Sequence, residues 1–407
     1  MNVKKIGVVL LAVALVAGMA GCFTPFRMQY QLTLSSTEGG EVTTPGEGTF
    51  TYWGGTVVNL VAEADEGYCF VNWTGDACAC NIADINAAST SITINNDYSI
   101  IANFAPEIYE NLEIWDWYGL DAVRDNLSEN YILMNDLDLT TIGYAELASP
   151  TANAGKGWEP IGTFYDEFTG TFNGQGYEIC NLFINRPNEY YIGLFGYVIE
   201  GVIKNLGVGN VDVTGYVDVG GLVGACNGTV SNSYSRGNVT GGAYIGGLIG
   251  GNAGIVNKSY STGNVTGLGC VGGLVSFNNQ VGTIGNSYSS ANVTGEQDIG
   301  GLVGKNDGTV SDSYSIGSVT GTEAVGGLVG ENDGTVINSF WNTETSGQTT
   351  SAGGTCKNTT EMQDITTFSG VSWDIVAVVN LEIHNPSYIW NIVDDDTYPF
   401  LSWQPIS

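Results

Sequence analysis

Residues 219–240 read VGGLVGACNGTVSNSYSRGNVT, and close copies of this stretch follow one another along the chain. The Gly-Gly-Leu element begins at Gly220, Gly246, Gly272, Gly300 and Gly326, which gives a period of 26 residues with one interval of 28. No apolar stripe of helical spacing lies inside the repeat. A fixed period of this length without helices predicts an all-β fold, a parallel β-helix (β-solenoid) of stacked coils.

The columns of one coil indicate which side chains point inward. Val219, Leu222 and Val230 stand in columns that are aliphatic in every copy, so we expect them in the interior. Ser233 and Ser235 suit a narrow interior, which places the intervening Tyr234 on the outer face. Because crossovers between parallel strands are nearly always right-handed, we expect a right-handed winding.

The tyrosines of the outer face form a column of their own. Identical residues one coil apart lie about 4.8 Å from each other, so their rings can stack. Mutual stacking explains the column without a ligand, but exposed rings beside Asn or Asp side chains would also suit a sugar. The candidate glycan-binding ladder consists of Tyr234, Tyr260, Tyr288 and Tyr314.

The repeated G-L-[V/I]-G core resembles the GLUG motif. The preceding FTGTFNGQGYEI and GLFGYV segments resemble the usual lead-in to such arrays, so the resemblance covers residues 131–345. GLUG arrays occur in large bacterial surface proteins, including filamentous adhesins and IgA-specific metallopeptidases. The resemblance implies display at the cell surface.

Residues 29–105 have a different pattern, in which apolar alternation is interrupted by Gly-Gly and Pro-Gly turns. The centre from Gly55 to Trp73 and the closing Tyr98–Phe104 resemble the bacterial B-repeat module of internalin-type surface proteins. The resemblance implies a small β domain that acts as a spacer or adhesive module.

Both ends of the repeat array need covering, because an open β edge recruits other chains. In the linker 106–130 we expect one capping helix over residues 108–127, with Leu120, Val123 and Leu127 on its apolar face. In the C-terminal cap 346–407 we expect a short helix over 359–364, and aromatic residues that close the far end.

The N-terminus is typical of an export signal. Lys4 and Lys5 precede an uncharged apolar run, and small residues lead to Cys22. This resembles a prokaryotic lipoprotein signal, which implies a signal peptide over 1–21, lipid on Cys22 and a tether over 22–28. The alternative is a plain secretory signal. We therefore expect an exported protein held at the envelope through its N-terminal lipid.

The chain has 11 Lys and Arg against 42 Asp and Glu, a formal charge of −31. Such acidity argues against nucleic acid as a partner, because phosphate contacts need Lys and Arg. Cys69, Cys78 and Cys80 stand close together, but a fourth zinc ligand is missing. A local disulfide is a better interpretation, and plain buried thiols a better one still.

Catalytic signatures are scarce, and we predict no cofactor and no enzyme. One histidine excludes most His-based triads, and H-E-x-x-H is absent. A glycosidase would need two carboxylates, for which Asp136 with Asp138 and the run 394–396 are candidates. Asp307 and Asp333 could share Ca²⁺, but the calcium β-roll pattern is absent.

Two function classes follow from the sequence. The first is a surface-anchored, non-catalytic, adhesin-like structural protein that displays a rod to the envelope, to other cells or to the matrix. The second is an extracellular polysaccharide-binding or polysaccharide-degrading β-helix protein. An extracellular glycan or a surface protein is the expected partner in either case.

Overall fold

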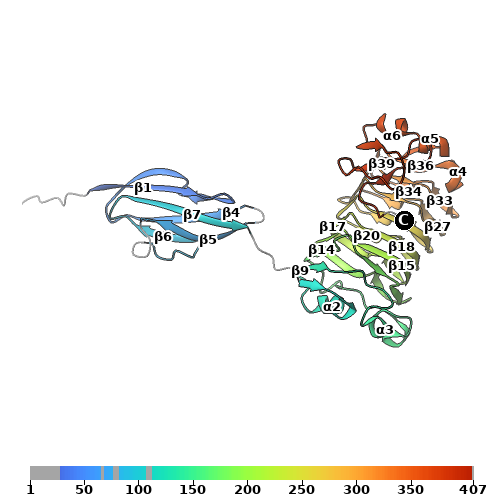
Figure 1. The fold of residues 1–407 in the computed structure, drawn as a ribbon, viewed down its shortest axis with the longest axis horizontal. Coiled ribbons are helices and arrows are strands. Elements are labelled where there is room, and N and C mark those ends of the chain that lie inside the picture. The colour runs from blue at the N-terminus through green and yellow to red at the C-terminus, as the bar shows by residue number, and fades with distance from the viewer. Residues whose placement is uncertain (1–27, 66–67, 77–81, 107–111, 406–407) are drawn as a thin grey trace, which may run out of the picture. The chain divides into compact units, whose positions relative to one another are not determined.

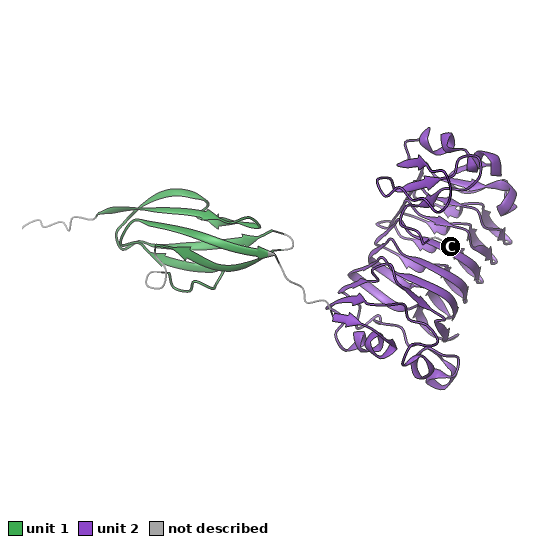
Figure 2. Cartoon of the chain, in the orientation of Figure 1, with its two compact units in different colours: residues 1–109 green, residues 110–407 purple. Residues whose placement is uncertain are grey.

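The structure is a computed structural model that describes residues 28–65, 68–76, 82–106 and 112–405. The chain divides into two compact units, residues 1–109 and 110–407, which Figure 2 colours separately. Each unit has its own hydrophobic core.

The first unit is a small β domain of two sheets. The four-stranded sheet has the order β3 (Gly48–Trp53), β1 (Gln29–Ser36), β7 (Tyr98–Pro106), β5 (Tyr68–Gly75). The three-stranded sheet has the order β2 (Gly40–Thr44), β4 (Val57–Ala64), β6 (Ser89–Thr93). Leu32, Leu60, Trp73 and Ile92 are fully buried in its core. The alternation of apolar residues therefore predicted this domain correctly.

The second unit is the predicted parallel β-solenoid, whose coils stack their strands into three parallel sheets (Figure 1); the coils of β8 and β9, at its N-terminal end, contribute no strand to the six-stranded sheet. The six-stranded sheet comprises β13 (Tyr190–Ile192), β16 (Val217–Gly220), β19 (Ala243–Gly246), β23 (Gly269–Gly272), β28 (Gln297–Gly300) and β33 (Glu323–Gly326). The main path of the second sheet runs from β8 (Leu112–Ile114) through β9 (Asn130–Leu133), β10 (Thr171–Asn173), β14 (Phe195–Lys204), β17 (Val223–Ser231), β20 (Ile249–Asn252), β24 (Val275–Asn278) and β29 (Val303–Asn306) to β34 (Val329–Asn332).

Shorter strands beside that path complete the second sheet: β21 (Ile255–Asn257), β25 (Thr283–Gly285), β30 (Thr309–Ser311) and β35 (Thr335–Ile337). The third sheet contains β11 (Glu178–Cys180), β12 (Phe183–Asn185), β15 (Gly207–Thr214), β18 (Tyr234–Thr240), β22 (Tyr260–Thr266), β26 (Tyr288–Ser289), β27 (Asn292–Thr294), β31 (Tyr314–Ser315), β32 (Val319–Thr320), β36 (Phe340–Asn342) and β37 (Thr355–Lys357). Equivalent residues of successive coils are paired in register, as between Tyr234 and Tyr260.

The Gly-Gly pair of the motif is required by the turn between the first two sheets. A Cβ on Gly246 would lie 1.9 Å from the carbonyl oxygen of Ile249. A Cβ on Gly247 would lie 2.1 Å from the carbonyl oxygen of Gly273 in the next coil. Neither position can carry a side chain, which explains why both glycines recur in each copy.

The predicted interior columns are confirmed. The leucines of the motif are fully buried in every copy. Ser233 is also fully buried, and Ser235 is 1% exposed. The serines form a hydrogen-bonded ladder. The Ser259 hydroxyl donates to the Asn257 carbonyl at 2.9 Å and accepts from the Ser233 amide at 3.3 Å. A second buried ladder runs through side-chain amides, with 2.8 Å between Asn252 and Asn278. Polar groups inside the rod are thus paired from coil to coil.

The N-terminal end of the solenoid is covered, but the prediction of one helix over 108–127 is wrong. Residues 112–114 form β8, and Asp116 then caps a helix, α2 (Trp117–Asp121), by accepting from the Gly119 amide. A 3-10 turn, η1 (Ala122–Asp125), follows, and Asn126 ends it. Leu120 and Val123 are fully buried as predicted. Two further short helical segments, α3 (Tyr144–Leu147) and η2 (Ala152–Gly155), complete this end.

The C-terminal segment begins with α4 (Thr343–Ser346), α5 (Thr359–Gln363) and α6 (Ile365–Ser369) over the last coil. The short helix expected over 359–364 is therefore confirmed as α5. The chain then forms β38 (Ile375–Ala377), β39 (Trp390–Ile392) and β40 (Phe400–Leu401), which make a small sheet of their own. These strands extend from the end to the side of the solenoid, because Trp390, Ile392 and Leu401 belong to one buried cluster with the rings of Tyr234 to Tyr314.

Candidate functional site

The predicted tyrosine ladder exists as a stack of rings. Tyr234 and Tyr260 have ring centroids 4.8 Å apart and an angle of 11° between planes. The next two intervals, through Tyr288 to Tyr314, are both 5.0 Å with angles of 7° and 3°. Parallel in-register strands impose this spacing, so the stacking follows from the repeat itself.

The ladder is buried, however, and the prediction that its rings face solvent is wrong. No ring of the four is more than 6% exposed. The C-terminal segment covers them: Trp403 lies 6.3 Å from the Tyr234 ring, and Trp390 lies 5.7 Å from the Tyr314 ring. The Tyr288 hydroxyl donates to Gln404 Oε1 at 2.9 Å. With both faces and edges covered, the ladder offers no platform for a sugar.

The same contacts correct the prediction for the C-terminal aromatic residues. Phe368 and Trp373 pack on Phe340 of the last coil and do close the end. Trp390 and Trp403 instead extend back along the ladder. The physical reason is that a continuous stack of rings is a large apolar surface, which is stabilised by burial under other aromatic side chains.

A different set of aromatic residues lies open on the corner between the six-stranded sheet and the second sheet. One side of this corner is a column of left-handed residues, which includes Tyr191, Asp218 and Tyr244 with φ of 58°, 56° and 58°. Across from it is a column set by strand register, in the order Tyr197, Ala225, Gly251, Phe277, Lys305. We call the space between the two columns the corner groove.

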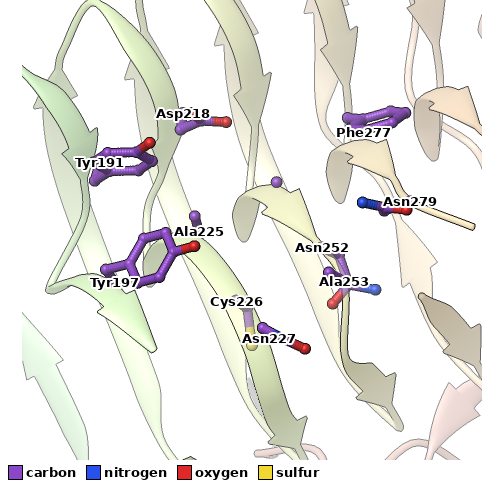
Figure 3. A pocket seen from close by; sticks show the side chains of 11 residues that line it. Tyr191, Tyr197, Asp218, Ala225, Cys226, Asn227, Asn252, Ala253, Phe277 and Asn279 are labelled. Atoms are coloured by element: carbon purple, nitrogen blue, oxygen red, sulfur yellow. The ribbon is translucent and has the colours of Figure 1, made fainter. Parts of the chain in front are cut away.

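The corner groove contains a hollow of about 200 Å³. Tyr191 and Tyr197 lie at one end of it and Phe277 at the other, while the small Ala225 and Gly251 separate them (Figure 3). The hollow exists because two successive coils carry almost no side chain in a column that is aromatic on both flanks. The residues lining it are Tyr191, Tyr197, Asp218, Ala225, Cys226, Asn227, Gly251, Asn252, Ala253, Phe277 and Asn279.

The rings at the N-terminal end of the groove are held by one another. Tyr191 and Tyr197 meet edge to face, with centroids 5.0 Å apart and an angle of 81°. Phe164 stacks on Tyr191 at 5.8 Å and 10°. At the other end, Tyr244 contacts Phe277 with centroids 5.9 Å apart. The ring positions are therefore fixed by protein contacts before any ligand arrives.

Asp218 supplies the charge of the hollow. Its carboxylate lies beside Gly251, where an added Cβ would be 3.1 Å from Oδ1. Burial raises the pKa of Asp218 from 3.8 to about 6. Within the described part of the chain, its side chain has no hydrogen-bond or ion-pair partner. Burial, followed by the nearby Asp218 charge, raises the pKa of Tyr191, while burial, the Glu167 charge and then the Asp218 charge raise the pKa of Tyr197.

Asp218 is the single acidic residue that lines the hollow, and no basic residue lines it. Glycoside hydrolysis in its usual form needs two carboxyl groups that flank the bond. The hollow has one. Its groups can therefore accept hydrogen bonds and stack against a ligand, but they do not make up that catalytic pair.

The carboxylates singled out in the sequence serve the backbone. Asp136 Oδ1 accepts from the Glu178 amide at 2.8 Å, and Asp138 Oδ1 accepts from the Thr140 amide at 2.8 Å. Hydrogen bonds from the Thr140 hydroxyl and then from the Thr140 amide lower the pKa of Asp138. Asp394 likewise accepts from the Ile365 amide. Asp138 thus fixes a local turn, whereas Asp136 and Asp394 each hold the backbone of a segment that is distant in the sequence.

Asp307 and Asp333 do lie in adjacent coils, but a lysine lies between them. Lys305 Nζ is 2.5 Å from Glu331 Oε1, 3.5 Å from Asp333 and 4.0 Å from Asp307. Over the described ranges, no group of three or more His, Cys, Asp or Glu side chains is arranged to hold a metal ion. Lys305 already supplies the positive charge that a calcium ion would bring.

Among the cysteines, Cys226 and Cys270 are buried thiols, whereas the Cys69 thiol is free and exposed, so the expectation of buried thiols is wrong for Cys69. Burial raises the pKa of Cys226 to about 11 and that of Cys270 to about 12, so both thiols stay protonated. Cys22, Cys78 and Cys80 lie outside the described residues. No helix in the described part of the chain is long and apolar enough to cross a membrane.

Comparison with protein families identifies the two kinds of module. Residues 30–108 match the divergent InlB B-repeat domain, and residues 295–320 match the GLUG motif. The chain joins a B-repeat domain to an array of GLUG repeats. Both resemblances drawn from the sequence are therefore confirmed.

The relatives of this GLUG-repeat chain are much longer proteins. A Gly-rich membrane protein of Evansella cellulosilytica is 44% identical over 116 residues, which are 27% of this chain and 12% of that protein. Halomucin of Haloquadratum walsbyi is 35% identical over 133 residues, 32% of this chain and 1% of its own length. The chain thus spans about an eighth or less of either relative.

One solved structure, titled IgA1 Protease, matches 70% of this GLUG-repeat chain and 22% of its own chain. The TM-score is 0.41 and the identity is 14%.

Proposed function

We propose that this chain is an envelope-associated, adhesin-like surface protein that binds an extracellular ligand in the corner groove without transforming it. The names of the two relatives, a membrane protein and a halomucin, support an envelope location. The two module types support display, since the B-repeat domain is a small β domain and the GLUG array is a rod of stacked coils with a long surface.

One observation carries the binding role: a hollow with open aromatic rings contains a carboxylate that no other side chain satisfies. An unpaired, partly buried carboxylate costs stability. Its retention beside Tyr191, Tyr197 and Phe277 is explained if a ligand supplies its hydrogen-bond donors. Stability sacrificed at one place is typical of a binding site.

We further propose that lipid on Cys22 holds the chain at the membrane, through the residues that resemble a lipoprotein signal. A single acyl chain binds membranes only marginally, so stable attachment would require a second membrane-binding signal beside it. Nucleic acid is not proposed as a partner, because the charge of −31 repels phosphate.

The runner-up function is degradation of an extracellular polysaccharide. It is favoured by the open, aromatic-lined shape of the corner groove and disfavoured by the single carboxylate in it. If the chain were a hydrolase, purified protein would release reducing ends from a polysaccharide, and Asp218→Asn would abolish that release.

The proposed function is tested by attachment of cells that display the full chain. Surfaces coated with extracellular polymer from the source culture should retain cells with the wild-type chain. Ala225→Trp, which fills the hollow, should reduce retention at least tenfold. Tyr177→Ala removes a 37% exposed ring outside the hollow and should have no effect. Equal retention of cells with wild-type and Ala225→Trp chains would refute the proposal.

A further inference from the structure

We propose, building on the ligand-binding role above, that the corner groove between Tyr197 and Phe277 binds an uncharged oligosaccharide that lies along the axis of the solenoid. The inference concerns the chemistry of the ligand and its direction. Three features of the groove carry it: its length, its hydrogen-bonding groups and its charge.

The length of the groove fits a chain-like ligand. Tyr197 and Phe277 are three coil steps apart in one register column, a separation of about 14 Å. The Ala225 and Gly251 positions between them leave the floor free of bulky side chains. Rings at both ends of a shallow floor suit the flat faces of successive sugar units.

The same separation excludes an aromatic cage for a single small cation. Such a cage needs several rings within about 6 Å of one charged group. Here the rings are grouped at opposite ends of the hollow, with Tyr191 and Tyr197 at one end and Tyr244 with Phe277 at the other. A ligand that touches both groups at once must therefore be extended.

The polar groups of the hollow are those that sugar hydroxyls require. Asp218 offers two acceptor oxygens and has no partner among the described side chains, while its burial strengthens any hydrogen bond that it receives. Asn227 and Asn279 are exposed at the opposite rim and offer both donors and acceptors. A hydroxyl-rich ligand can satisfy all of these groups, whereas an apolar peptide segment would leave Asp218 unpaired.

The charge of the surroundings selects against anionic sugars. Asp218 lies within the hollow, and Asp298 stands further along the same corner column. The cation nearest in the opposite column, Lys305, is already paired with Glu331. A uronate or sulfate ester placed here would meet a negative field without a free cation, so its binding is opposed.

Binding is measured with the purified full chain and two matched sets of oligosaccharides, one uncharged and one carrying uronate or sulfate groups. We expect a dissociation constant in the micromolar to millimolar range for at least one uncharged member, and at least tenfold weaker binding of its anionic counterpart. Tighter binding of the anionic set would overturn the inference.

Three variants test the position of the ligand. Phe277→Ala removes one terminal ring, Asp218→Asn removes the charge, and Ala225→Trp fills the floor. Each should weaken binding at least tenfold, while Tyr177→Ala and the exposed Asp212→Asn should not change it. Circular dichroism establishes that each variant is folded. Because Phe277 is only partly buried, Phe277→Ala keeps the test valid if Ala225→Trp does not fold.

The outcomes separate the inference from the proposed function. Loss of cell attachment in Ala225→Trp, without uncharged-sugar binding by the wild type, would overturn the sugar assignment and leave the adhesive role standing. Sugar binding that is lost in Phe277→Ala, without any effect on attachment, would support the sugar site and refute the adhesive role. Unchanged sugar binding in Phe277→Ala and Asp218→Asn would place the sugar elsewhere and overturn the inference.

Discussion

Replacing Asp218 by Asn should stabilise the solenoid at neutral pH, with an effect that fades in acid. The Asp218 carboxylate is largely buried without a partner, and burial raises its pKa from 3.8 to about 6. A rise of about two pKa units corresponds to about 3 kcal/mol of unfavourable free energy for the ionised form in the fold. Since part of the Asp218 side chain meets solvent, we expect Asp218→Asn to raise the free energy of unfolding at neutral pH by about 2–3 kcal/mol.

The direction of the pH dependence follows from proton binding. Below pH 3.8 Asp218 is protonated in both the folded and the unfolded chain, and burial of the charge costs nothing. Between pH 3.8 and about 6 the unfolded chain has lost the proton and the folded chain still holds it. The contribution of Asp218 to stability therefore falls as the pH rises through this window, and it is constant above it.

Differential scanning calorimetry at pH 4.5 and pH 7.5 measures the effect while staying above the isoelectric point of about 4.1. Asp218→Asn should raise the melting temperature of the solenoid by a few degrees at pH 7.5 and by much less at pH 4.5. Leu274→Ala identifies the solenoid transition, because only that transition should shift. Asp212→Asn, an exposed change in the same coil, is the matched control.

A melting temperature that Asp218→Asn lowers at pH 7.5 would show that the carboxylate has a stabilising partner in the fold. An equal increase at both pH values would show that the gain does not come from the buried charge. Either result would refute the interpretation of Asp218 as an unsatisfied acid, on which the binding role rests.

Three further predictions concern the rod, its cover and its anchor. Leu274→Ala truncates a fully buried side chain and should cost about 2–5 kcal/mol in chemical denaturation; an unchanged midpoint would contradict the inward column. Tyr288→Ala should loosen the segment that ends near Gln404, so that limited proteolysis cuts it earlier than in Tyr288→Phe, which keeps the ring and loses one hydrogen bond. Cys22→Ala should move the chain from the detergent phase to the aqueous phase, and equal partitioning of both forms would argue against a lipid anchor.

The rod could be predicted from the sequence because its determinants repeat. Leu222 and its counterparts are buried in every coil, and Ser233 and Ser235 face inward as their small size suggested. When equivalent positions of every coil carry the same kind of side chain, the register of the strands alone determines whether that column points inward or outward. Because side chains alternate along a strand, the inward orientation of Ser233 and Ser235 also predicted that Tyr234 points outward from the coil.

Whether that outward face meets solvent could not be predicted from the repeat. It is decided by residues such as Trp390 and Trp403, which lie far from Tyr234 in the sequence and outside the repeat. The local sequence of residues 375–401 does not indicate that β38–β40 pack along the tyrosine ladder as well as at the last coil. The length of the helix at the other end was overestimated for a similar reason. Pairing with β9 makes residues 112–114 the strand β8, so the helix begins only after Asp116.

The corner groove escaped prediction because it depends on the columns in which the copies differ. Aligning the copies emphasises what they share, and the column of Tyr197, Ala225, Gly251 and Phe277 shares nothing. The signal that would have found it is the interruption of an aromatic column by two small residues, next to a column that holds Asp218. Such a signal is visible only once the register of the coils is known.

Repetition and binding make opposite demands on a solenoid. In the ladder from Tyr234 to Tyr314 every coil contributes a ring, and the ring centroids are 4.8–5.0 Å apart. This spacing leaves no room for a ligand between the rings. A groove needs rings at its ends and an absence between them, which Ala225 and Gly251 provide. In this architecture the identical columns therefore stabilise the rod, and a ligand site arises where the identity of a column is broken.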